Sequence, residues 1–255
     1  MKQLDGFEVD MEFPIVKPKG IKQISSFMPN SLMISSSSDL NYISKLHIRE
    51  SIKNISFLMS NLYAVKGEVS NYCLVGPFIG APYAIILFET LVASGAKFII
   101  MIGWCGSICD EVKIGDIIVP SKAIIDEGTS IHYGCQLNEM VDCSNTASNS
   151  LKKMMRKKEI NFIDCPIWTT DAIYRETPSK IEYFKKKGAK AVDMETSAFF
   201  SSARHHNVDI GCVLIVSDEL SSLKWNPGFQ NNKFVESRKL VCDALYDYMI
   251  NGFSD

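Results

Sequence analysis

The feature that most constrains the fold is a wholly apolar run at residues 98–102, which ends in Gly103. A run without polar alternation is typical of a β-strand that is buried on both faces, inside a sheet covered by helices. A helical pattern at about residues 84–94 precedes the run, and Gly95 supplies its C-terminal stop. This stretch therefore predicts an α/β fold.

Strands and helices alternate along the rest of the chain, without an internal repeat. The further elements that we expect are strands at residues 117–120 and 211–216 and helices at residues 178–187, 195–206 and 233–250. No Pro/Gly/Ser-rich linker divides the 255 residues, a length that can bury a substantial core. We predict a single α/β domain over residues 1–255, with a central mixed β-sheet flanked by α-helices.

The charge pattern argues against nucleic acid as a partner. There are 27 basic and 29 acidic residues, which give a net charge of -2 and a pI near 6.1. The basic residues form a block only around residues 152–158, where Met154 and Met155 are interleaved, so the block is typical of the solvated face of a helix. We expect neither nucleic acid nor a membrane as a partner.

The eight cysteines show no regular disulfide framework, and the chain starts without a charged-then-apolar signal segment. We therefore expect a reduced, cytoplasmic protein. Neither the pair Cys105 and Cys109 nor the pair Cys135 and Cys143 has the Cys-x2-Cys spacing of structural zinc sites. We expect no metal and no cofactor.

A glycine-bearing segment at residues 103–107 follows the apolar run and carries Cys105. It superficially matches a nucleophile elbow, in which a catalytic Cys occupies a tight strand-to-helix turn. The sequence favours another interpretation, because residues 108–116 lack a helical apolar stripe: Cys105 would be a small packing residue in a turn that lines a pocket. Two other functions remain open, a cysteine hydrolase that pairs Cys105 with His132 and a non-catalytic ligand-binding protein.

Two acidic loops carry the most informative chemistry. Asp193-Met194-Glu195 stands at the start of an expected helix, and Asp218 directly follows an expected strand. Ligands of open α/β sheets collect at the carboxyl ends of strands. The helix dipole explains one acid at a helix start, but it does not explain the second acid. One carboxylate can hold a sugar while the other protonates a leaving group, which predicts an enzyme.

Several motifs together resemble those of the nucleoside phosphorylase superfamily, of the purine nucleoside phosphorylase and uridine phosphorylase type. The similar patterns are a glycine-rich turn at residues 76–80, I-G-x-x-G-S at residues 102–107, G-D-hydrophobic-hydrophobic-x-P at residues 115–120, D-M-E at residues 193–195 and S-D at residues 217–218. The resemblance implies cleavage of the N-glycosidic bond of a nucleoside by inorganic phosphate, which gives a free base and ribose 1-phosphate. It also implies a phosphorylase-like fold and a homo-oligomer, a dimer, trimer or hexamer, whose partners are the nucleoside and phosphate.

The resemblance implies roles for individual residues as well. The implied ribose contacts are Glu195, Met194, Asp193 and His132, and the implied base contacts are Tyr174, Ile173, Cys105 and Gly106. Asp218 matches the acid that protonates purine N7, so it must hold a proton at neutral pH or receive one from solvent. This favours a purine over a pyrimidine substrate.

The implied phosphate site departs from the family pattern. Residues 35–40, four serines followed by Asp39 and Leu40, stand where the family has a Gly-Asp-Pro-x-x-Arg loop. The family's arginine before I-G-x-x-G falls at Met101, and its hydroxyl residue falls at Trp104. The candidate phosphate contacts that we consider are Ser36, Ser37, Arg49, Arg175 and Trp104.

The loss of these contacts makes hydrolysis by water, as in the related nucleosidases, the second hypothesis. Phosphorolysis remains the first, because residues 126–133 resemble the uridine phosphorylase-like members of the superfamily. That resemblance also keeps uridine as an alternative substrate.

Overall fold

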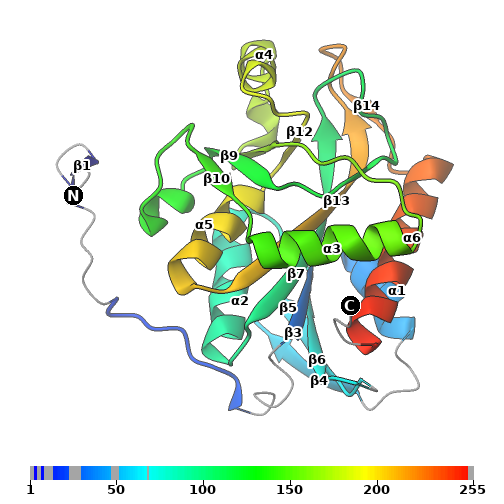
Figure 1. The fold of residues 1–255 in the computed structure, drawn as a ribbon. Helices are drawn as coiled ribbons and strands as arrows, with labels where there is room; N and C mark the ends of the chain where they lie inside the picture. The colour runs from blue at the N-terminus through cyan, green and yellow to red at the C-terminus, as the bar shows by residue number, and fades with distance from the viewer. Residues whose placement is uncertain are drawn as a thin grey trace.

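A twelve-stranded mixed β-sheet forms the centre of the molecule (Figure 1). The computed structural model describes residues 3–4, 7–8, 14–22, 30–46, 52–67 and 69–251. The strands of the sheet are β3 (Asn30–Ile34), β4 (Ile52–Phe57), β5 (Ser60–Val65), β6 (Tyr72–Gly76), β7 (Phe98–Ser107), β8 (Ile117–Ile118), β9 (Lys122–Asp126), β10 (Met140–Asp142), β11 (Ile167–Thr170), β12 (Ala191–Asp193), β13 (Asp209–Glu219) and β14 (Asn226–Pro227). The short strands β1 (Gln3–Leu4) and β2 (Phe7–Glu8) form a separate antiparallel pair.

Helices cover both faces of this sheet. In the described part of the chain they are α1 (Ser37–Leu46), α2 (Ala81–Ala93), α3 (Asn145–Lys157), α4 (Pro178–Lys186), α5 (Thr196–His206) and α6 (Asn232–Ile250), with short 3-10 turns η2 (Ser130–Tyr133) and η3 (Ile173–Arg175). The last three expected helices agree with α4, α5 and α6 to within one residue. The expected helix at residues 84–94 is α2, which starts earlier because Pro82 suits a first helical turn. The predicted α/β fold with a mixed sheet is confirmed.

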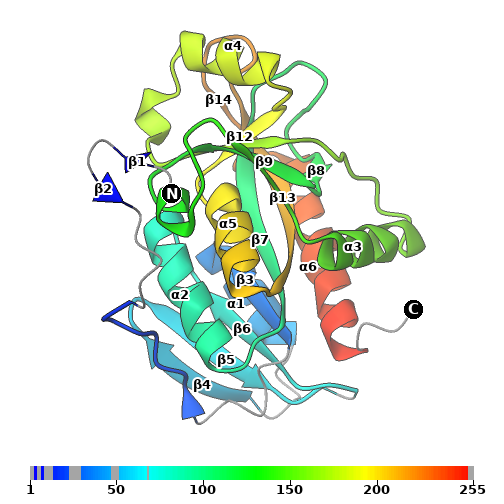
Figure 2. The ribbon, with the colours of Figure 1, turned by 60° about the vertical axis from the view of Figure 1, so that its left-hand side comes forward.

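Strand β7 lies between β3 and β13 and is parallel to both. Its buried side chains alternate between two cores: Ile99 and Met101 pack on the side of α2 and α5, whereas Ile100 and Ile102 pack on the side of α1, α3 and α6. Figure 2 shows α2 and α5 on one side of β7 and α6 on the other. Residues 99–102 are thus buried on both faces, as the apolar run predicts, and Phe98 is partly buried.

The expected turn at residues 103–107 is wrong, because β7 continues through Ser107. β13 runs beside β7 from the pair Asp209 and Phe98 to the pair Glu219 and Ser107, and so supplies backbone partners beyond Gly103. Cys105 therefore stands within a strand, and the strand-to-helix turn that a nucleophile elbow needs is missing. The expected strand at residues 117–120 is shorter than predicted, ending before Pro120, which has no backbone N–H to donate.

The parallel direction of β3, β7 and β13 brings their carboxyl ends to one edge of the sheet. The start of α1, the end of β7 and the acidic end of β13 therefore meet there. β12 pairs with β7 at Gly106 and Ser107, which adds the loop that contains Glu195 to the same edge. None of the helices in the described part of the chain combines the length and apolar character needed to cross a bilayer.

Candidate active site

A cavity of about 460 Å³ lies at this edge of the sheet. Its lining includes residues 35–38 after β3, residues 104–106 of β7, residues 192–195 at the end of β12, and Ser217 and Asp218 of β13. Segments far apart in the sequence therefore contribute to one site at strand ends, as expected for an α/β sheet.

Glu195 lies at the start of α5, and its side chain is buried in the cavity lining. Its Oε1 accepts a hydrogen bond of 2.6 Å from the N–H of Gly80. Gly80 has a φ of 81°, a conformation that glycine adopts without strain. The glycine-rich turn before α2 thus binds a carboxylate of the protein itself. Burial, together with the charge of Asp193, raises the pKa of Glu195 above its usual range.

Asp193 is also buried in the lining, and its oxygens are occupied by neighbours. Oδ1 accepts a hydrogen bond of 2.6 Å from Thr169 Oγ1, and Oδ2 accepts from the N–H groups of Glu195 at 3.2 Å and Thr196 at 2.8 Å. These bonds fix the start of α5 and hence the position of Glu195. The ribose contacts of Asp193 and Met194, both in the lining, stay predictions.

Asp218 lies where the register between β13 and β7 shifts. Ser217 Oγ donates to its Oδ1 at 2.6 Å, and Trp225 Nε1 donates to its Oδ2 at 3.0 Å. Trp225 stands just before β14, which pairs with this end of β13. A Cβ atom on Gly106 would lie 3.1 Å from Asp218 Oδ2, so the glycine makes room for the carboxylate. Two donors and one glycine therefore hold Asp218 at the cavity.

A further carboxylate, Glu176, lines the cavity directly after η3. Burial, reinforced by the nearby charge of Asp218, raises the pKa of Glu176 to about 7. Such a group holds a proton on a sizeable fraction of molecules at neutral pH. The sequence analysis missed Glu176, because only its burial distinguishes it from a surface glutamate.

The expected base contacts are only partly brought together. Ile173, Cys105 and Gly106 line the cavity, whereas Tyr174 is 97% exposed and does not line it. Burial raises the pKa of the Cys105 thiol well above its usual value, so the thiol stays protonated and adds an uncharged side chain to the cavity lining. The lining also contains Phe78 and Phe229, to which the sequence analysis assigned no base contact. Apolar and aromatic side chains suit a flat base.

His132 lies in η2 and lines a separate hollow of about 480 Å³, together with Glu89 and Tyr133. The structure does not bring His132 and Cys105 into one cavity, so the geometry of a Cys–His hydrolase is not formed. A contact between His132 and a ribose would need a second copy of the chain, and it stays a prediction.

Residues 35–38 and Trp104 form the part of the cavity that we call the serine end. Ser36 and Ser37, two of the candidate phosphate contacts, lie in it. Ser36 Oγ accepts hydrogen bonds from the N–H of Ser38 at 3.2 Å and of Asp39 at 3.5 Å, and so caps α1. The serine end is therefore the N-terminus of a capped helix.

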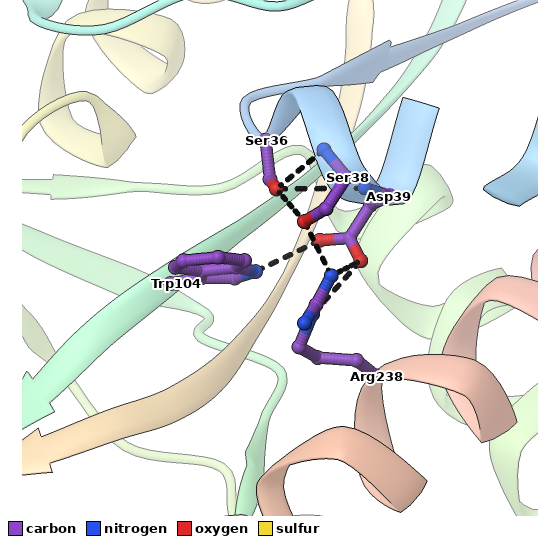
Figure 3. Close-up of polar contacts among 5 residues, drawn as sticks. All are labelled: Ser36, Ser38, Asp39, Trp104 and Arg238. Atoms are coloured by element: carbon purple, nitrogen blue, oxygen red, sulfur yellow. Dashed lines mark hydrogen bonds and ion pairs between the residues drawn. The ribbon is translucent and has the colours of Figure 1, made fainter. Parts of the chain in front are cut away.

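The structure locates one of the two arginines considered as phosphate contacts. Arg175 is exposed and is not among the lining residues, and Arg49 lies outside the described residues. Instead, Arg238 of α6 reaches this region, where it pairs with Asp39 at 2.6 Å and donates to Ser38 Oγ at 2.5 Å (Figure 3). No spacing pattern could have indicated this contact, because Arg238 and Asp39 are 199 positions apart.

The carboxyl groups are the ionisable groups that matter most for charge in the cavity lining. Its four ionisable acids are Glu176, Asp193, Glu195 and Asp218, and none of the lining residues in the described part of the chain is Lys, Arg or His. Within the described ranges no three His, Cys, Asp or Glu side chains are grouped so that they could hold a metal ion.

One family model matches most of the chain. The model of the Phosphorylase superfamily matches residues 32–246, and the chain belongs to this superfamily. The resemblance seen in the motifs is thereby confirmed.

The relatives that are similar in sequence include a purine nucleoside phosphorylase. A purine nucleoside phosphorylase of the DeoD type from Caldanaerobacter subterraneus subsp. tengcongensis is 34% identical over 150 residues, which cover 57% of this chain and 63%, less than two thirds, of that enzyme. An uncharacterised protein of Acanthamoeba polyphaga mimivirus is 30% identical over 180 residues, or 69% of this chain and 70% of that protein.

Solved structures share the fold at lower identity. The purine nucleoside phosphorylase of Toxoplasma gondii has a TM-score of 0.79 at 18% identity and covers 94% of this chain and 98% of its own. The uridine phosphorylase of Vibrio fischeri has a TM-score of 0.75 at 20% identity, with 88% and 92% covered.

Proposed function

We propose that the chain cleaves the N-glycosidic bond of a purine nucleoside, with Glu195 at the ribose and Asp218 at the base. The observation that carries this proposal is that both carboxylates line one cavity but are held by different elements. Glu195 is fixed by the N–H of Gly80, and Asp218 is fixed by Ser217 and Trp225. Two independently held carboxylates can serve two different parts of one substrate.

The chemistry requires this division of labour. As the glycosidic bond breaks, positive charge develops on the ribose and negative charge on the departing base. Asp218 would deliver a proton to purine N7, which neutralises the base as it leaves. Glu176, whose pKa is raised to about 7, would keep a proton close to Asp218 at neutral pH. Glu195 would accept hydrogen bonds from the ribose hydroxyls.

The purine assignment rests on Asp218 and agrees with the names of several relatives. The bacterial relative is named a purine nucleoside phosphorylase, as is the structural neighbour from Toxoplasma gondii. The neighbour from Vibrio fischeri is named a uridine phosphorylase, so uridine is the matched competitor substrate. The relatives are named phosphorylases, so phosphate is the acceptor to test beside water.

Two further properties belong to the proposal. A homo-oligomer would allow His132 of one copy to approach the ribose of another. A reducing compartment such as the cytoplasm suits the eight cysteines, which are all buried and free.

Release of free base from inosine, adenosine, methylthioadenosine and uridine, each with and without phosphate, tests the proposed cleavage. We expect release from purine nucleosides, lowered about 10²–10⁴-fold by Asp218→Asn because the general acid is lost. Asp142→Asn removes an exposed carboxylate paired with Lys122 and should leave the rate unchanged. No release from any of the four nucleosides would refute the proposal.

A further inference from the structure

The serine end of the cavity contains a closed ion pair rather than a free cation. Asp39 Oδ1 accepts hydrogen bonds from Nε and Nη2 of Arg238 at 2.9 and 2.6 Å, and Asp39 Oδ2 accepts one from Trp104 Nε1 at 2.8 Å (Figure 3). Both partners are sheltered, with 3% of the Asp39 side chain and 15% of the Arg238 side chain exposed. The positive charge of Arg238 is therefore neutralised where it stands.

Several other donors near this end are also occupied. The N–H groups of Ser38 and Asp39 at the start of α1 donate to Ser36 Oγ, and the remaining contact of Arg238 Nη2 goes to Ser38 Oγ. The guanidinium lies 4.7 Å from the Trp104 ring centre, so the indole covers one of its faces. A free anion would have to displace several of these contacts before it could bind.

In the proposed cleavage, the serine end would lie on the acceptor side of the reacting bond. Gly106 contacts Asp218, whereas Trp104 contacts Asp39, and the two residues are two apart on β7. Residues two apart on a strand lie on the same face and about 7 Å apart. A base protonated by Asp218 would thus leave on one side, and an attacking group would come from the side of Trp104.

The electrostatics of the cavity disfavour an anionic acceptor. Four carboxylic groups line the cavity, without Lys, Arg or His among the described lining residues. Inorganic phosphate carries roughly one to two negative charges near neutral pH. Binding it here would place an anion beside acidic groups without a cationic partner among the described lining residues, whereas water carries no charge.

We propose that Asp39, Trp104 and Arg238 form a neutral wall that excludes phosphate from the serine end, so that water accepts the pentosyl group. This inference rests on the proposed cleavage of a nucleoside. The water oxygen forms a bond to the anomeric carbon while the C1′–N9 bond breaks and its electron pair moves to the base. A proton from Asp218 goes to the base. One proton of the attacking water is released to solvent, and Asp218 takes up a proton from solvent again. The products are free base and ribose.

The first test measures the binding of inorganic phosphate by calorimetry. We expect no binding to the unaltered protein at millimolar phosphate. Asp39→Asn keeps the size of the side chain but frees the charge of Arg238, so this variant should bind phosphate at least about tenfold more tightly. Asp247→Asn is the matched control. It removes a carboxylate of α6, the helix of Arg238, that pairs with Lys158, and this variant should behave like the unaltered protein.

Submillimolar phosphate binding by the unaltered protein would overturn the proposal that the neutral wall excludes phosphate, whether or not the Asp39→Asn variant folds. Loss of such binding in Arg49→Ala would then assign the missing cation to Arg49. An Asp39→Asn variant that is folded, as shown by a cooperative unfolding transition, but gains no phosphate affinity would also contradict the proposal.

The second test identifies the product formed from inosine in heavy-oxygen water. We expect ribose that carries the heavy oxygen, formed at a rate that does not depend on phosphate. Ribose 1-phosphate as the product would overturn the water assignment and leave the nucleoside cleavage intact. If no base is released under either condition, the proposed cleavage is refuted, and the binding test still decides whether the serine end admits phosphate.

Discussion

Asp218 and Gly106 face each other at paired positions of β13 and β7. The lack of a side chain at Gly106 is what allows the carboxylate to approach: a Cβ atom there would lie 2.9 Å from Leu220 Cδ1 and 3.1 Å from Asp218 Oδ2. The resemblance implies Gly106 as a base contact. The structure adds a second reason for a glycine at this position, which is the room that it leaves for the Asp218 carboxylate.

Gly106→Ala should lower base release by up to about 10²-fold, because a small displacement of a catalytic group is costly. The fold should persist, since Leu220 is a flexible side chain that can yield. The measurement is kcat/KM for the best purine nucleoside together with the unfolding midpoint. Gly128→Ala, where the nearest described atom would be 3.6 Å away, is the matched control. Equal kcat/KM values for the two variants would contradict the role of Gly106.

Glu176 makes a prediction about pH. Its pKa is raised in the fold from 4.5 to about 7, so between these values the folded protein binds more protons than the unfolded chain. The free energy of unfolding that depends on Glu176 therefore falls as pH rises from about 4.5 to about 7, and it is constant above that range.

Glu176→Gln should remove this loss of stability. We expect the variant to gain about 1–2 kcal/mol relative to the unaltered protein between pH 4 and pH 8, less than the full shift implies because solvent reaches the group. Urea unfolding at both pH values measures the difference. Glu182→Gln, at an exposed residue of α4 paired with Lys185, should show no comparable change. A gain that is equal at both pH values would show that titration of Glu176 is not its cause.

At the scale of elements, the pair of Asp39 and Arg238 fastens α1 to α6. Trp104 of β7 completes the contact, and its ring packs edge-on against Phe234 of α6 at 5.1 Å. The start of α1, which carries the serine end, is thereby fixed by a helix near the end of the chain.

Asp39→Ala should lower the free energy of unfolding by about 3–5 kcal/mol, because it leaves a sheltered guanidinium without its partner. Asp142→Ala breaks an exposed ion pair with Lys122 and should cost about 0–1 kcal/mol. Urea unfolding at one pH compares the two variants. A cost below about 1 kcal/mol for Asp39→Ala would mean that α1 is held by apolar packing alone.

On the scale of the whole molecule, the sheet separates two apolar cores. Ile85 of α2 lies in one core and Ile43 of α1 lies in the other, and both are almost fully buried. A change of packing in one core should therefore leave the stability contributed by the other core unchanged, because the strands of the sheet lie between them.

Ile85→Val and Ile43→Val should each cost about 0.5–1.5 kcal/mol, and their effects should add to within about 0.5 kcal/mol in the double variant. A double-mutant cycle from urea unfolding measures the coupling. Coupling above about 1 kcal/mol would indicate that the sheet transmits packing changes between the two cores.

The sequence by itself determined the features that depend on neighbouring residues. The buried strand at residues 98–102, three helices and the carboxylates Glu195 and Asp218 at strand or helix ends follow from apolar periodicity and short motifs, and these motifs also identified the superfamily. Such patterns are set by the backbone geometry of a few consecutive residues.

Only the tertiary structure decided which distant residues meet. Gly80 and Glu195 are 115 positions apart, and Asp39 and Arg238 are 199 apart, yet each pair is in hydrogen-bond contact. β7 continued past its expected end because β13 lies beside it, and the pKa of Glu176 rose because the fold buries it. The physical reason is the same in each case: hydrogen bonding, burial and charge depend on what packs nearby in space, which no local spacing encodes.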